Sequence, residues 1–109
     1  MKHYDERLHK MLEYKRPHGS QGEIDFINKF LLGSYDVMYL GAEDDPAAYL
    51  ILVDGDPDTM FSCHIDTVHS VTGKQRIKYN RDKQVYYKDD KQPLGADDTA
   101  GCWLMLEMI

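Results

Sequence analysis

The chain has 109 residues, with 13 Lys and Arg against 19 Asp and Glu, so its formal net charge is −6 at pH 7. Hydrophobic residues make up 42% and charged residues 29%, a balance typical of a folded domain rather than a disordered tail. No apolar run approaches the ~18 residues of a membrane span, and no basic cluster favours a nucleic-acid partner. Two cysteines are too few for a disulfide scaffold, so we expect a reducing, cytoplasmic setting. The length predicts one domain over residues 1–109, and we expect neither a membrane nor a nucleic-acid partner.

The first part of the chain predicts two helices. Residues 4–16 place apolar side chains at helical spacing, and Pro17 ends the pattern. Ser20 and Glu23 then have the spacing of a capping box, which opens a second helix. The apolar side of this helix would carry Ile24, Phe26, Ile27, Phe30 and Leu31.

The pattern then changes to short apolar and aromatic runs that predict strands. Residues 35–40 and 49–53 are two such runs, separated by a turn at 41–46. Residues 50–53 are continuously apolar, which favours a strand buried on both faces. A third strand is predicted over Met60–Ile65.

The last part of the chain predicts a polar hairpin and a buried helix. Residues 76–79 and 85–88 flank the turn residues of the hairpin, and the segment 100–109 is apolar nearly all round. The order of these elements predicts an α/β fold in which helices flank a mixed β-sheet.

One candidate site lies at the end of the third predicted strand. On a strand, residues two apart share a face, so His64 and Asp66 would point the same way. A histidine with a carboxylate on its second ring nitrogen suits a metal ligand, because the carboxylate fixes the tautomer and raises the basicity of the ring. The alternative is a histidine that is simply hydrogen-bonded at a strand end.

A second candidate lies in the string Leu94-Gly95-Ala96-Asp97-Asp98-Thr99-Ala100-Gly101. The acids suit the start of a helix, where Asp98 or Thr99 would cap the first turn. A phosphate-binding loop is disfavoured, because two carboxylates would repel an anion and the string lacks a lysine. A carboxylate at this position could instead bridge two cations.

Taken together, the two strings resemble the co-catalytic dizinc exopeptidases, and most closely the peptidase T-like members with the patterns His-x-Asp-Thr-Val and Leu-Gly-Ala-Asp-Asp-x-Ala-Gly. The resemblance implies the first half of such a catalytic domain, hydrolysing small peptides or N-acyl amino acids. It implies that His64 and Asp97 bind metal, with Asp97 bridging two ions, and that Asp66 serves catalysis by orienting His64. The implied cofactor is Zn²⁺, two per complete site, with Co²⁺ or Mn²⁺ as alternatives.

This sequence also departs from the family. His69 stands where the family often has proline, either as an extra ligand or as a solvated loop residue, and Thr99 replaces a frequent Lys, Arg or Asn. The family's general base, a glutamate, and its remaining ligands lie further along the family's chain, and no residue here stands in a matching context. The expected partners are therefore a small peptide substrate and a complementary C-terminal half or a second copy.

Two other functions remain open. The chain could be a non-catalytic relic of the fold that binds a partner through its apolar last helix around Trp103. It could also be a single-metal hydrolase acting alone, which would show chelator-sensitive activity without any partner.

Overall fold

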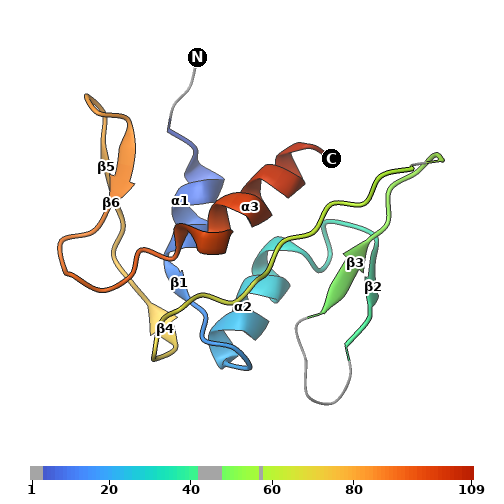
Figure 1. The fold of residues 1–109 in the computed structure, drawn as a ribbon, viewed down its shortest axis with the longest axis horizontal. Coiled ribbons are helices and arrows are strands. Elements are labelled where there is room, and N and C mark those ends of the chain that lie inside the picture. Colours follow the sequence, from blue (N-terminus) through green and yellow to red (C-terminus); the bar gives the residue numbers. More distant parts are fainter. Residues whose placement is uncertain (1–3, 42–47, 57) are drawn as a thin grey trace.

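Three helices and three strand pairs are found in the computed structural model, which describes residues 4–41, 48–56 and 58–109 (Figure 1). Helices α1 and α3 pack against each other, and strand β1 and helix α2 lie next to them. The helices are α1 (Glu6–Leu12), α2 (Gln21–Phe30) and α3 (Ala96–Glu107). The strands are β1 (Tyr14–Lys15), β2 (Val37–Tyr39), β3 (Tyr49–Ile51), β4 (Gly73–Lys74), β5 (Lys78–Asn80) and β6 (Val85–Tyr87). In the described ranges, each helix is too short or too polar to cross a membrane.

The chain combines helices and strands as predicted, but the prediction of a single mixed sheet is wrong. The described strands form three separate antiparallel pairs, β1 with β4, β2 with β3 and β5 with β6. The predicted strand Met60–Ile65 has no strand partner in the described part of the chain. An apolar run predicts an extended backbone but does not say which segment will pair with it.

The first helix is shorter than predicted. It ends at Leu12, and the chain continues as strand β1 rather than as helix to residue 16. Asp5 caps the start of α1, where its carboxylate accepts a hydrogen bond from the amide of Leu8 at 2.9 Å. The second helix begins after Ser20 as predicted, although the Ser20 hydroxyl makes no capping hydrogen bond and Glu23 accepts from the amide of Gly19 instead.

The core lies between the three helices. Its buried residues are Met11 from α1, the apolar side of α2 that the sequence predicts, and Cys102 and Leu106 from α3. Ile24 is the exception on α2, because it lies partly exposed at the edge of the stripe. The remaining buried members are Phe26, Ile27, Phe30 and Leu31.

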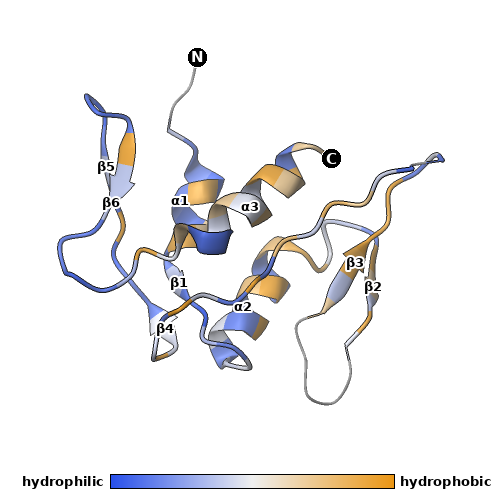
Figure 2. Ribbon diagram, in the orientation of Figure 1, coloured by the Kyte–Doolittle hydropathy of each residue, from blue (hydrophilic) through white to orange (hydrophobic). Residues whose placement is uncertain are grey.

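Two segments predicted to be fully buried are not. Leu52 and Val53 are exposed beyond the end of β3, and Leu104 is exposed on the outer side of α3. Figure 2 shows that α3 begins with hydrophilic residues and is more hydrophobic along the rest of its length. A continuous apolar run is buried on both faces only where other elements cover both of them. Among the described residues, no element covers the outer faces of these two segments.

The two strands predicted on either side of the 41–46 turn pair as a hairpin, and the predicted polar hairpin forms as well. Val37 pairs with Ile51 in the first, and Lys78 pairs with Tyr87 in the second, while residues 42–47 of the first turn lie outside the described residues. In the second hairpin, Tyr79 and Tyr86 face each other and pack their rings on Tyr4. This hairpin is therefore attached to the region around α1 by aromatic contacts.

Candidate functional site

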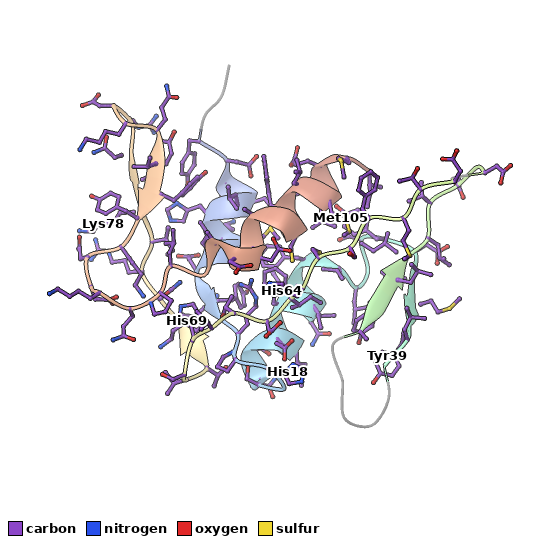
Figure 3. The ribbon with its side chains drawn as sticks, viewed as in Figure 1. His18, Tyr39, His64, His69, Lys78 and Met105 are labelled. Carbon is purple, nitrogen blue, oxygen red and sulfur yellow. The ribbon has the colours of Figure 1, made fainter. Side chains whose placement is uncertain are left out.

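The structure brings His64, Asp66 and Asp97 together, although 33 residues separate the first from the last. The Nε2 atom of His64 lies 2.9 Å from the Oδ1 atom of Asp97, at the start of α3. The Nδ1 atom lies 3.1 Å from the Oδ1 atom of Asp66 and 2.9 Å from its main-chain oxygen. Figure 3 shows His64 near the middle of the molecule. The two strings identified in the sequence therefore form one cluster.

The hydrogen bonds around His64 define its protonation. Main-chain oxygens only accept, so Nδ1 donates to Asp66, and Nε2 donates to the carboxylate of Asp97. Burial opposes the charged ring, but the hydrogen bonds and negative charges of Asp97 and Asp66 outweigh it and raise the pKa of His64. This geometry, with an acid at each ring nitrogen, favours the protonated form of His64.

Asp97 and Asp98 have different roles at the start of α3. The carboxylate of Asp97 is 95% exposed, so its second oxygen is open to solvent. Asp98 caps the helix, because its Oδ1 atom accepts a hydrogen bond from the amide of Gly101 at 3.1 Å. A side chain at Gly101 would collide with this carboxylate, and the peptide bond between the two aspartates is cis. Of the two predicted capping residues, Asp98 makes such a hydrogen bond, although it lies inside α3, whose N-cap position is Gly95.

A buried arginine connects the two halves of the cluster. The Nε atom of Arg16 donates to the carbonyl of Ile65 at 2.6 Å, and its Nη2 atom donates to the hydroxyl of Thr99 at 2.6 Å. The main chain of Arg16 also bonds Thr67: its carbonyl accepts from the amide of Thr67 at 2.7 Å, and its amide donates to the hydroxyl of Thr67 at 2.9 Å. The side chain of Arg16 thus holds two parts of the site together. These are the segment that carries His64 and Asp66, and the first turn of α3.

Arg16 is an unusual core residue. Its side chain is fully buried, and its guanidinium lies 4.0 Å from the centroid of the Phe26 ring. Burial lowers the pKa of Arg16 to about 10, which leaves the group charged at neutral pH. The remaining hydrogen bonds go to the carbonyls of Met11 and Tyr14, both at 3.0 Å. The acceptors of these four side-chain hydrogen bonds are all neutral oxygens.

A thiol on α3 supports the same segment from the other side. The Sγ atom of Cys102 donates to the carbonyl of His64 at 3.2 Å. The neighbouring Cys63 thiol and burial raise the pKa of the Cys102 thiol, so it keeps the proton that this bond needs. The backbone of His64 is therefore fixed, while its ring is half-exposed.

His69 is not a solvated loop residue, and its ring nitrogens bond residues other than His64, Asp66 and Asp97. It is buried, and Figure 3 places it nearer to β4 than His64. Its Nδ1 atom accepts from the hydroxyl of Thr67 at 2.6 Å, and its Nε2 atom donates to the carbonyl of Pro93 at 2.8 Å. No local pattern predicts this role, because it depends on the fold bringing the side chain of Gln75 and the carbonyl of Pro93 to Nε2.

Within the part of the chain that the structure describes, no group of three or more His, Cys, Asp or Glu side chains is arranged to hold a metal ion. His64 and Asp97 are two donors, and Asp66 contacts His64 on the ring nitrogen that points away from Asp97. In comparisons with known proteins, no family model, no curated protein and no solved structure matches this chain.

Proposed function

We propose that this chain supplies part of the metal site of a zinc-dependent exopeptidase, in which His64 and Asp97 bind the metal and Asp66 orients His64. The observation that supports the proposal is the 2.9 Å separation of the His64 Nε2 and Asp97 Oδ1 atoms. The substrate class would be small peptides or N-acyl amino acids, as the resemblance of the two sequence strings implies.

The positions of the donor atoms fit a zinc ion. Two ligands of one tetrahedral zinc, each at about 2.0–2.2 Å, lie about 3.3 Å apart. The two donor atoms are 2.9 Å apart, so a change of a few tenths of an ångström would admit the ion in place of the Nε2 proton. Asp66 already occupies Nδ1, which leaves Nε2 as the metal-binding nitrogen. The exposed second oxygen of Asp97 suits a bridge to a second ion.

The bound metal would polarise the scissile carbonyl and lower the pKa of a water molecule. Catalytic zinc takes three protein ligands and a water, and peptide hydrolysis needs a base for that water. In the proposal, a complementary segment supplies the base and the remaining ligands. The residues of this chain hold the metal, fix the tautomer of His64 and set the distance between its two strings.

Titration with Zn²⁺ by isothermal titration calorimetry tests the proposal directly. We expect weak saturable binding, and we expect His64→Ala or Asp97→Asn to lower the affinity at least about tenfold. Asp66→Ala should lower it less, because the main-chain oxygen of residue 66 still accepts from Nδ1. Asp82→Asn, on the exposed turn of the β5–β6 hairpin, is the matched control and should leave the affinity unchanged.

Equal losses of Zn²⁺ affinity in Asp82→Asn and Asp97→Asn would contradict a specific site and indicate general attraction of Zn²⁺ to an acidic chain.

To test the peptidase activity, the chain would be mixed with the C-terminal half of a peptidase T-like enzyme. Chelator-sensitive hydrolysis of small peptides that neither part shows alone would support the proposal. Failure to gain activity over the separate parts would contradict it.

Exposed apolar side chains favour a second candidate, an interaction module without catalysis. Phe61, which precedes His64 in the sequence, is 62% exposed, and Val68, which follows Asp66, is 77% exposed. Leu104 is exposed on α3. Exposed apolar groups of this size are typical of contact surfaces. A chain that binds no Zn²⁺ and forms a dimer disrupted by Leu104→Asp would favour this candidate over the metal site.

A further inference from the structure

A cavity of about 240 Å³ lies beside strands β1 and β4, separate from the His64 cluster. It has both polar and apolar walls and is partly open to solvent. Pockets for drug-sized ligands are typically about 300–1,000 Å³, so this one suits a smaller ligand. We call it the basic cavity, and define it by the lining side chains of Lys15, His69, Lys74, Arg76, Lys88 and Asp90.

The basic cavity is positively charged in a chain that is negative overall. Four cationic side chains and one carboxylate line it, a net charge of +3 beside a total of −6 for the chain. In the described residues, neither Lys15 nor Arg76 forms a salt bridge, and the ammonium of Lys74 lies 3.6 Å from the centroid of the Tyr14 ring. Most of this positive charge is therefore left without a carboxylate from the same chain.

The inner wall of the basic cavity is held rigidly. The side-chain Nε2 atom of Gln75 donates to the carbonyls of Leu12 and Leu94, both at 2.8 Å, so the side-chain oxygen Oε1 faces the other way. That oxygen accepts from His69 Nε2 at 3.1 Å and from the ammonium of Lys88 at 2.5 Å. The Lys88 charge is thus fixed in position by hydrogen bonds.

His69 adds rigidity but no charge. Burial lowers the pKa of His69, and the nearby ammonium groups of Lys88 and Lys15 lower it further, so the ring is neutral at pH 7. Lys88 is enclosed, with its side chain only 7% exposed, and it contacts Asp90 at 3.1 Å. Lys15 and Arg76 are more accessible at the rim, where a ligand could reach them.

We propose that the basic cavity binds a phosphate dianion, as inorganic phosphate or as the phosphoryl group of a small monoester. A dianion matches a net charge of +3 better than a single carboxylate does, and the fork of Arg76 can donate two parallel hydrogen bonds to phosphate oxygens. The hydroxyl of Ser70, which also lines the cavity, offers a further donor. This site does not depend on the proposed metal centre.

Isothermal titration calorimetry with inorganic phosphate and with glycerol 3-phosphate, at an ionic strength held constant with NaCl, tests the proposal. We expect saturable binding, with a several-fold weaker affinity in Arg76→Gln and in Lys15→Gln. Asp90→Asn should tighten binding, because it removes the only carboxylate that the described residues contribute to the cavity wall and keeps an acceptor for Lys88. Lys29→Gln, an exposed change on α2 that does not line the cavity, should have no effect.

Opposite effects of Arg76→Gln and Asp90→Asn with an unchanged Lys29→Gln variant would support a site at this cavity. Tighter binding of glycerol 3-phosphate than of phosphate would identify a monoester as the ligand, and the reverse order would identify the free ion. An affinity weaker than about 10 mM in the parent protein, or equal losses in Lys29→Gln and Arg76→Gln, would overturn the proposal.

Discussion

An Arg16→Ala variant is expected to have a free energy of unfolding about 3–5 kcal/mol lower than the parent protein. The substitution removes the donors of four buried or partly buried hydrogen bonds, to the carbonyls of Met11, Tyr14 and Ile65 and to the hydroxyl of Thr99. It also opens a cavity above the ring of Phe26. Since a domain of this size is typically stable by only about 5–15 kcal/mol, the variant should be close to unfolding at 37 °C. Urea denaturation followed by circular dichroism measures the change.

Two variants separate the causes. Arg16→Lys keeps a positive charge but loses the fork, so it should recover only part of the lost stability. Arg81→Ala, on the exposed turn after β5, should change the free energy of unfolding by less than about 0.5 kcal/mol. If Arg16→Ala were no more destabilising than Arg81→Ala, the hydrogen bonds of Arg16 could not be what holds the cluster together.

Local signals in the sequence correctly predicted helix α2 and the strands of the β2–β3 and β5–β6 hairpins. In both hairpins, turn residues separate short apolar or aromatic runs that can pair with each other without help from a distant segment. Helix α2 carries its own apolar stripe, and the core covers Phe26 and Phe30 as that stripe predicts. These elements depend mainly on residues that are neighbours in the sequence.

The errors concern contacts between distant residues. Helix α1 was predicted to continue to residue 16, but Pro17 disfavours a helical backbone at the residue before it, and the extended Arg16 bonds to the 65–67 segment. The missing mixed sheet has a similar cause, because an apolar run such as 60–65 does not specify its partner. A buried arginine is also hard to read from sequence, since its acceptors are main-chain oxygens that every residue has.

The candidate site was partly predictable for a physical reason. Residues two apart on an extended segment can face the same way, so the proximity of His64 and Asp66 follows from their spacing. The prediction that Asp97 joins them instead came from the family pattern, and the structure places Asp97 Oδ1 2.9 Å from His64 Nε2. The sequence does not identify Arg16 and Cys102, which fix the backbone around His64, because their acceptors are the carbonyls of Ile65 and His64, far away in the sequence.

A Gly22→Ala variant is expected to lower the free energy of unfolding by about 3 kcal/mol, although alanine has the higher helix propensity. A methyl group at Gly22, in the first turn of α2, would lie 2.1 Å from the carbonyl oxygen of Lys15 and 2.8 Å from the hydroxyl of Thr72. The first of these is a main-chain atom, so the clash requires helix α2 and strand β1 to move apart. That movement would also disturb Arg16, the residue after Lys15, and hence the His64 cluster.

Asn28→Ala, on the exposed side of the same helix, is the matched control for the helix propensity of alanine. It should raise the free energy of unfolding by about 0.5 kcal/mol. Urea denaturation measures the free energy of unfolding of both variants. The decrease in Gly22→Ala should be larger than the increase in Asn28→Ala. A Gly22→Ala variant as stable as Asn28→Ala would mean that α2 and β1 are not in close main-chain contact. The support that β1 gives to the 65–67 segment through Arg16 would then lose its structural basis.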